Sequence, residues 1–277
     1  MKKQQIKVKW VGPAAKIDPE SNKDLLTLVN HKVLIKKFGK ERIRLYEYGA
    51  KKLLNYVRAL FKRYKLLSSY HDFGHNYVTT ITSIRAYIGA IKLGKSFNED
   101  DFRCLLIVSL FHDTGYLKMR KEKESVWATI HSKQSRVLMR KSLKDVILLN
   151  KDKFDSFLRD IGDYDPWKIL DIEKIVDLQK FTNYSRWKMN KEKIKKNKIA
   201  QILVASDLMQ VVDKNYFNNR EALEVYIMSK KDKDHTKFYE FEKEGVKWIW
   251  KYLDAFYGAK NRNPYRKMWE FFKDQVL

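Results

Sequence analysis

The chain contains few of the residues that interrupt helices, and this constrains its fold more than any other feature. Only ten glycines and four prolines occur among its 277 residues. So few over this length favour long helices over a turn-rich all-β fold. Hydrophobic residues make up 44% of the chain and aromatic residues 14%, enough for a substantial core. We therefore predict an all-α fold, a bundle of helices.

The hydrophobic pattern also suggests how the chain is organised. Residues 1–22 carry little pattern and include two prolines, so we expect an irregular N-terminal lead-in. Residues 23–66 have a helical pattern, with apolar residues on one face and lysines and arginines opposite. We predict one main helical domain over residues 23–220. Residues 221–277 are expected to add a helical C-terminal elaboration packed on the same domain.

Two histidines four residues apart follow a pair of candidate helix caps. Ser68 and Ser69 are suitable N-caps for a helix that carries His71 and His75 and ends at Gly94. At this spacing both imidazoles share a helix face and can reach one site. One can then bind a metal ion while the other acts as a general acid. The alternative is a pair of partly exposed histidines with no shared role.

A second helix ends in a histidine and an aspartate. Asn98 is a suitable cap for this helix, which runs through "FRCLLIVSLF" to His112 and Asp113, with Gly115 placed to stop it. An apolar helix of this kind is expected to be buried, and a buried carboxylate is costly unless its charge is neutralised. A metal ion would bind both side chains and supply that charge. Alternatively, Asp113 accepts hydrogen bonds near a turn and His112 is a satisfied core residue.

An aspartate on an apolar helix face is the next unusual residue. On a helix, Asp207 has Leu203, Val204 and Val211 as neighbours three or four positions away. Such a carboxylate is either a metal ligand held from the core side or the partner of a lysine or arginine from elsewhere. His131, on a predicted helix over residues 122–146, also faces inward, as a possible ligand or as a hydrogen-bonded core residue.

The remaining composition narrows the setting and the partners. The single cysteine, Cys104, excludes an intramolecular disulfide and a Cys-rich metal motif. The N-terminal residues lack the apolar core of a signal peptide, and the longest apolar run, "CLLIVSLF", is too short to cross a bilayer. We therefore expect a cytoplasmic protein that does not act at a membrane. The other two histidines, His31 and His235, have no such company and are read as structural.

The formal net charge of +24 raises the question of nucleic-acid binding. Lysine greatly outnumbers arginine, however, and the lysines are scattered over nearly every segment. Lysine is the weaker residue for bidentate phosphate recognition. The charge is compatible with compositional bias, with nucleic acid, or with attraction of a small anionic substrate. We favour the small substrate.

Taken together, the candidate ligands occur in the order His75, His112-Asp113 and Asp207, all on predicted helices. Imidazole and carboxylate ligands suit Mg, Mn, Fe, Ni or Zn. Such an ion can polarise a phosphoryl oxygen and lower the pKa of a bound water. A second ion sharing Asp113 would clamp the attacking and leaving oxygens, so one or two ions fit the pattern.

These residues in this order resemble the HD superfamily of metal-dependent phosphohydrolases, over about residues 65–220. The stretch "YHDFGH" is similar to the "YHN-x-x-H" signature of the branch that includes cyclic-nucleotide phosphodiesterases, with Asp72 in place of Asn. The resemblance implies a helical bundle around the metal site. It also implies that His71 protonates the leaving oxygen, while the four candidate ligands hold the metal and Asp113 also serves catalysis.

Two further stretches carry the resemblance. "HDTGY" is similar to the HD-x-G variants, with Tyr116 in place of Lys in the HD-x-G-K members. The stretch from His131 to Ser135 resembles an "HE-x-x-S" element, with Ser132 in place of Glu, and implies that His131 contacts a second metal or the substrate phosphate. The implied pocket-wall residues are Tyr116, Lys118, Ser135, Asp213 and Tyr216.

The sequence therefore predicts a metal-dependent phosphohydrolase, a phosphodiesterase or phosphomonoesterase, that cleaves a nucleotide-like phosphoester, with a cyclic nucleotide among the candidate substrates. Two alternatives stay open. One is a sensor that binds metal and nucleotide without turnover, and the other is a nucleic-acid-binding HD nuclease that uses the positive charge. The sequence predicts neither the substrate, nor the metal, nor the oligomeric state.

Overall fold

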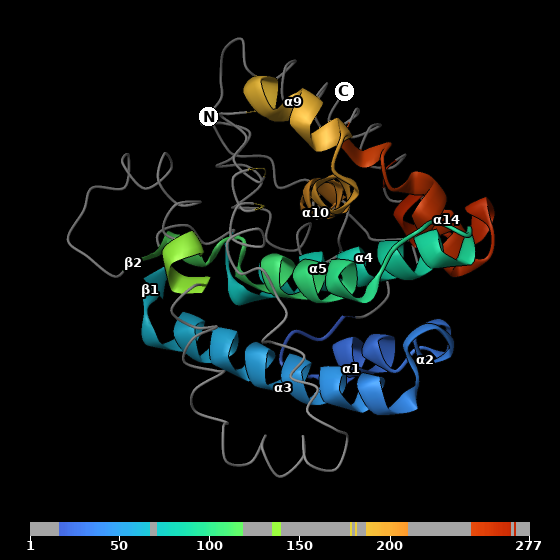
Figure 1. The fold of residues 1–277 in the computed structure, drawn as a ribbon. Coiled ribbons are helices and arrows are strands. Elements are labelled where there is room, and N and C mark those ends of the chain that lie inside the picture. Colours follow the sequence, from blue (N-terminus) through green and yellow to red (C-terminus); the bar gives the residue numbers. More distant parts are fainter. Residues whose placement is uncertain are drawn as a thin grey trace, which may run out of the picture.

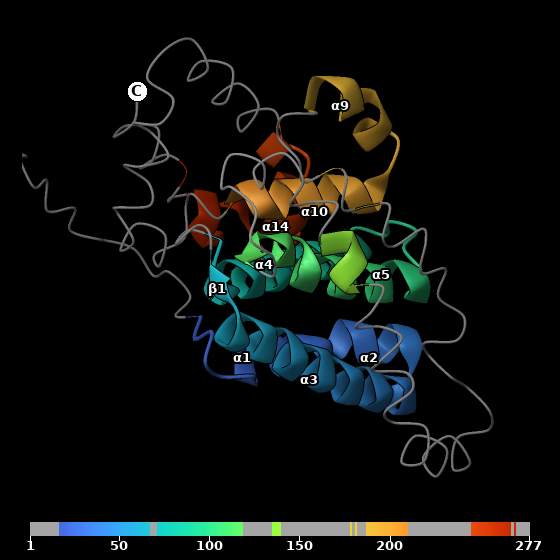
Figure 2. The same ribbon diagram turned by 90° about the vertical axis from the view of Figure 1, so that its left-hand side faces the viewer.

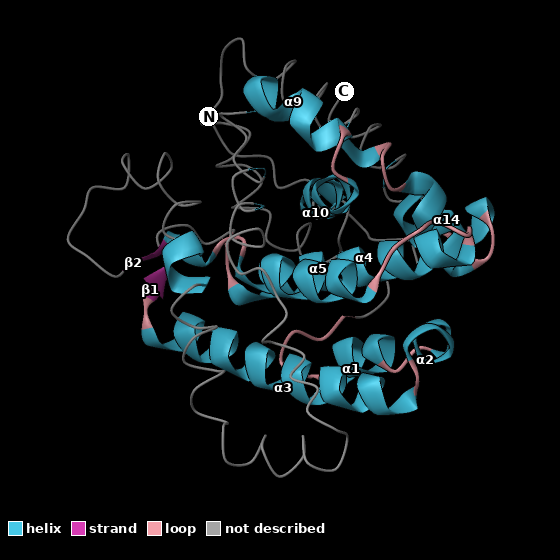
Figure 3. Ribbon diagram, in the orientation of Figure 1, coloured by secondary structure: helices cyan, strands magenta, loops and turns pink. Residues whose placement is uncertain are grey.

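Helices account for almost all of the regular structure in the computed structural model (Figure 3). The structure describes residues 17–66, 71–118, 135–139, 178, 181, 187–209, 245–266 and 269. Within this part of the chain, two strands of two residues each, β1 (Lys65–Leu66) and β2 (Leu117–Lys118), pair antiparallel. The predicted all-α fold is confirmed.

The described helices lie in layers, which Figure 1 and Figure 2 show from two directions. The first layer contains α1 (Lys23–Val29), α2 (Lys32–Phe38) and α3 (Lys40–Arg63). The middle layer contains α4 (Phe73–Lys92) and α5 (Glu99–Phe111). Above it lie α10 (Lys198–Leu208) and α14 (Trp250–Tyr257), with α9 (Trp187–Lys195) outermost.

The helical pattern over residues 23–66 is divided into three helices rather than one. The first break falls at Asn30 and His31, where the His31 side chain caps α2 by accepting a hydrogen bond from the Val33 amide. The second falls at Gly39, whose φ of 88° lies in a region that side chains disfavour. The long helix α3 then buries one face on the core, as its periodicity predicts.

Helix α4 is the centre of the described structure. It is buried along most of its length and packs against helices of both other layers, as well as against α5. At Gly89 the backbone of α14 comes so close that an added Cβ would lie 1.7 Å from the carbonyl oxygen of Tyr252. Gly94, with a φ of 69°, follows the end of α4 at the predicted position.

The start of α4 differs from the prediction. The N-cap is Asp72, whose carboxylate accepts a hydrogen bond from the His75 amide at 2.8 Å. His71 therefore lies just before the helix, and the prediction that it shares a helix face with His75 is wrong. Aspartate is as good an N-cap as serine, and the cap at Asp72 starts α4 later in the chain than a cap at either serine would. The predicted caps, Ser68 and Ser69, lie outside the described residues.

Helix α5 begins where the sequence predicts and ends earlier. Asn98 and Asp101 form a capping box, each side chain accepting a hydrogen bond from the other residue's amide. The helix ends at Phe111, and His112 and Asp113 form the turn that leads into a short 3-10 helix, η1 (Thr114–Tyr116). Gly115 lies inside η1, so the prediction that it stops the helix is wrong.

The remaining expectations on the fold have different outcomes. Among the described residues, no helix combines the length and apolar character needed to cross a bilayer. Helix α14 packs on α4. The domain boundaries stay predictions. Residues 1–16 and most of the predicted helix over residues 122–146 lie outside the described part.

Candidate metal centre

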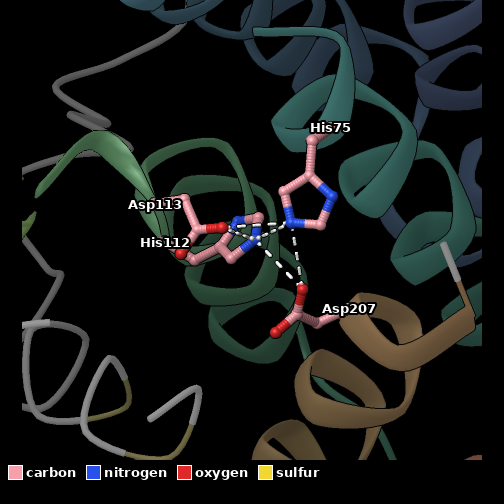
Figure 4. Close-up of side chains that lie close together, drawn as sticks. All are labelled: His75, His112, Asp113 and Asp207. Carbon is pink, nitrogen blue, oxygen red and sulfur yellow. Dashed lines mark hydrogen bonds and ion pairs between the residues drawn. The ribbon is translucent and has the colours of Figure 1, made fainter. Parts of the chain in front are cut away.

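Four potential metal ligands meet where α4, α5 and α10 come together (Figure 4). His75 lies in the first turn of α4, His112 and Asp113 directly follow α5, and Asp207 lies in the last turn of α10. One donor atom from each residue lies within 4.8 Å of the other three. The structure thus brings together the four residues that the sequence singled out, from three segments of which the first and last lie more than 130 positions apart along the chain.

The distances between donor atoms are short and similar. His75 Nε2 lies 3.0 Å from Asp113 Oδ2, 3.1 Å from Asp207 Oδ1 and 3.1 Å from His112 Nε2. His112 Nε2 lies 3.4 Å from each of the same two carboxylate oxygens. All of these atoms point toward one common centre, as Figure 4 shows.

These separations fit a shared divalent ion. Metal–ligand bonds of about 2.1 Å place neighbouring donors about 3.0 Å apart at right angles and about 3.4 Å apart at tetrahedral angles. The five separations that involve an imidazole nitrogen span 3.0–3.4 Å and cover both geometries, so the spacing does not select one coordination number. Two imidazoles and two carboxylates are ligands for Mn, Fe, Ni or Zn, and the carboxylates also suit Mg.

The charges of the cluster are balanced within it. Burial alone would lower the pKa of His75, but hydrogen bonds and charges from Asp113 and Asp207 outweigh it and raise this pKa to about 10. The pKa of His112 is also raised, because the two carboxylates again outweigh burial. Burial would raise the pKa of Asp207, but the imidazoles hold it at about 2, and they hold that of Asp113 well below its usual range. With no ion bound, protons on the imidazoles neutralise the buried carboxylates.

Carbonyl groups at the end of α5 orient His112. Its Nδ1 donates to the Ser109 carbonyl at 2.7 Å, because a carbonyl oxygen can only accept. The neutral ring then carries its proton on Nδ1 and presents the Nε2 lone pair to the site, as metal ligation requires. The next two carbonyls accept from the Asn76 amide and the Thr114 hydroxyl. These side chains fix the turn that holds His112 and Asp113.

Asn76 is a site residue that the sequence reading missed. It is completely buried and its Nδ2 donates to the Leu110 carbonyl at 2.9 Å, joining α4 to the end of α5. A buried asparagine next to a ligand histidine on an apolar helix is a signal of such a role, since buried amides need partners. The signal was available in "GHNYV", although the partner was not.

His71 lies beside the cluster without belonging to it. Its Nδ1 is 2.5 Å from Asp113 Oδ2, and its ring stacks on Tyr116 with ring centroids 3.9 Å apart and planes 3° apart. His71 and Asp207 have side chains 22% exposed, whereas His75, His112 and Asp113 are at most 4% exposed. Solvent therefore reaches the site from the side of His71 and Asp207.

The structure places the other predicted site residues as follows. Ser135 is completely buried and its hydroxyl accepts a hydrogen bond from the Gly115 amide at 2.7 Å, which ties the turn after Asp113 to a neighbouring segment. Tyr116 is the residue stacked on His71. Lys118 lies in β2, and its side chain is not described. Three predicted residues lie outside the described part: His131, Asp213 and Tyr216.

The two histidines read as structural also have clear positions. His31 caps α2, and its ring lies near Phe256 with centroids 5.8 Å apart, remote in its contacts from the metal cluster. His235 lies outside the described residues.

Comparisons with known proteins found no relative: no protein-family model matches the chain, and no curated protein or solved structure matches it.

Proposed function

We propose that the protein is a metal-dependent phosphohydrolase that cleaves a nucleotide-like phosphoester, with a cyclic nucleotide among the candidate substrates. One observation carries the proposal. Two histidines and two aspartates converge on one point, and a further histidine lies against one of the aspartates but outside the group of four. A purely structural metal site is closed by its ligands, whereas this one has a histidine on its accessible side.

The proposed chemistry divides between the ion and the chain. A divalent ion held by His75, His112, Asp113 and Asp207 would polarise a phosphoryl oxygen and lower the pKa of a coordinated water. The chain itself orients His71: Asp113 accepts from Nδ1, which directs the opposite ring nitrogen away from the carboxylate. That nitrogen can transfer a proton to the leaving oxygen. Tyr116 fixes the plane of the same ring by stacking.

The substrate class is supported by charge and by the sequence pattern. The chain carries a formal net charge of +24, which attracts anions to the protein. The order of the ligands along the chain, with the "YHDFGH" stretch before them, resembles the HD phosphohydrolases and their phosphodiesterase branch. These points support a phosphorylated, nucleotide-like molecule without selecting one.

The proposal is tested by an activity screen on protein stripped with EDTA and reloaded singly with Mg, Mn, Fe, Ni or Zn. The substrates are cyclic nucleotides, cyclic dinucleotides, nucleoside mono- and triphosphates, alarmones and short RNA. Three variants accompany the wild type: Asp113→Ala, His71→Ala and His31→Asn. The last is the matched control, because it replaces a histidine remote from the cluster and keeps a side chain able to cap α2.

We expect metal-dependent hydrolysis of at least one phosphoester by wild type and by His31→Asn. Asp113→Ala is expected to lose both metal and turnover, and His71→Ala to keep metal and lose turnover by about 100-fold or more. Turnover that persists after complete metal removal would refute the mechanism. Tight nucleotide binding with no product under any metal would instead identify a sensor. Hydrolysis of RNA alone would identify a nuclease.

A further inference from the structure

Within the described part of the chain, an arginine buried between α4 and α14 has no acidic hydrogen-bond or ion-pair partner. Arg85 is only 9% exposed, and its Nη1 donates to the Tyr265 hydroxyl at 3.0 Å. The same hydroxyl forms a second hydrogen bond with Thr82 on α4, at 2.9 Å. The guanidinium also lies 5.9 Å from the ring centroid of Tyr257, the last residue of α14. These contacts are with neutral groups, and the carboxylate of Asp24 acts on Arg85 electrostatically without forming an ion pair with it.

Other arginines in the described part of the chain show how the fold treats such charges. Arg103, 2% exposed, pairs with Asp100 on the same helix. Arg266 pairs with Asp254 of α14, with contacts of 2.5 and 2.8 Å, and Asn263 also donates to this carboxylate. Asp254 is therefore already occupied, and Arg85 forms no ion pair with any described carboxylate. Burying a charge without an ion-pair partner is costly compared with the marginal stability of a folded protein.

Two hydrogen-bond donors in this place also lack acceptors. Within the described part of the chain, the Nε of Arg85 and the hydroxyl of Tyr257 are buried and have no hydrogen-bond partner. Burial raises the pKa of Tyr257 above its usual value, so the phenol keeps its proton and can donate it. Each such donor is expected to find an acceptor in a folded protein. One anion could accept from both and neutralise the arginine as well.

We propose that Arg85, Tyr257, Tyr265 and Thr82 form a binding site for a small phosphate-type oxyanion. The Nε edge of a guanidinium matches two oxygens of a phosphate in a bidentate arrangement, and a phenol hydroxyl adds a third hydrogen bond. Arg85 lies ten residues beyond His75 on α4, about 15 Å along the helix. The anion site is thus separate from the metal centre, and it does not depend on the proposed function.

The test measures phosphate binding to the full chain in EDTA, by thermal unfolding and by isothermal titration calorimetry. Inorganic phosphate is compared with acetate and with chloride at matched ionic strength, because the chain's positive charge attracts every anion to some extent. Arg85→Met removes the charge and keeps a side chain of similar length. Arg103→Met is the matched control, since it removes a buried arginine that has its own carboxylate partner.

We expect wild type and Arg103→Met to bind phosphate saturably, and acetate and chloride to give a smaller, non-saturating response. Arg85→Met is expected to bind phosphate about ten-fold or more weakly, because it loses a charged donor. An equal phosphate response in wild type and Arg85→Met would overturn the proposal, as would the absence of a saturable response in wild type. Saturable acetate binding equal to that of phosphate would overturn the phosphate assignment.

Tyr257→Phe keeps the test decisive if Arg85→Met does not fold. Without phosphate, this variant is expected to unfold at the same or a higher temperature than wild type, because it removes a buried hydroxyl without a partner. With phosphate, it is expected to bind about ten-fold more weakly. Unchanged phosphate affinity, or a lower unfolding temperature in phosphate-free buffer, would overturn the assignment of this hydroxyl as an anion donor.

Discussion

Metal uptake by the cluster is expected to release protons and to tighten as the pH rises. With no ion bound, Asp113 and Asp207 raise the pKa of His75 to about 10, so His75 is protonated at neutral pH. Its Nε2 must lose that proton before it can bind a metal. The pKa of His112 is raised by the same two carboxylates, so His112 can release up to one further proton when metal binds.

The size of the effect follows from these protons. Each proton released changes the apparent association constant about ten-fold per pH unit, equivalent to about 1.4 kcal/mol. The carboxylates contribute none at neutral pH, because the pKa of Asp207 is about 2 and that of Asp113 is also lowered. We therefore expect the affinity to rise between about ten- and 100-fold per pH unit from pH 6 to pH 8.

The stability of the metal-free protein has the opposite dependence. The pKa of His75 in the fold, about 10, lies above its unfolded value of 6.5. A raised pKa means that the folded state holds the proton more tightly, so this stabilisation is complete below pH 6.5 and is lost as the pH rises through 10. In the same window, bound metal replaces the proton. The difference in unfolding temperature between loaded and metal-free protein is therefore expected to grow with pH.

Isothermal titration calorimetry with Mn or Zn measures the proton count. The titration is repeated at pH 7 in buffers of different ionisation enthalpy, and the slope of binding enthalpy against buffer enthalpy gives the number of protons released. We expect one to two protons for wild type and for the control His31→Asn. A slope of zero, with an affinity that does not change between pH 6 and pH 8, would refute the protonation scheme.

Three further predictions concern packing and capping in the helices that carry the ligands and in the turn after α5. Gly89→Ala is expected to lower the free energy of unfolding in urea by about 1–3 kcal/mol, because the new Cβ meets the Tyr252 carbonyl. Alanine has the higher helix propensity, so a gain in stability would show that the clash is relieved and would contradict the prediction. Asn98→Ala breaks the capping box with Asp101 and is expected to cost about 1 kcal/mol in the same assay, with unchanged metal stoichiometry. Asn76→Ala leaves a buried carbonyl without its hydrogen-bond donor, and is expected to lower the free energy of unfolding by about 1–3 kcal/mol and to weaken metal binding. Unaltered metal affinity would show that the turn is held without Asn76.

Three of the four ligands were predictable because they break a local pattern. His112 and Asp113 end an apolar helix and Asp207 lies on an apolar face, and such positions make a polar side chain costly unless it has a specific partner. That the three segments converge could be stated only as a hypothesis, since periodicity gives the face of a helix and not its neighbour. The structure supplies the convergence.

The residues that position the ligands could not be predicted in the same way. Serine and aspartate are similar N-caps, so the sequence did not decide where α4 begins or that His71 lies before it. Asn76 and Tyr116 act through partners that come from other segments of the fold. The sequence also could not predict that Arg85 lacks an ion-pair partner among the described residues, because this depends on which arginine pairs with which carboxylate in the fold, as Arg266 does with Asp254.

A crystal of protein loaded with Mn or Zn, measured at the absorption edge of that metal, tests the metal centre most directly. We expect an anomalous peak about 2.0–2.3 Å from Nε2 of His75 and His112 and from one carboxylate oxygen each of Asp113 and Asp207. His71 is expected to lie outside bonding distance. An anomalous map with no peak among these four residues, from protein shown to contain the metal, would contradict the account.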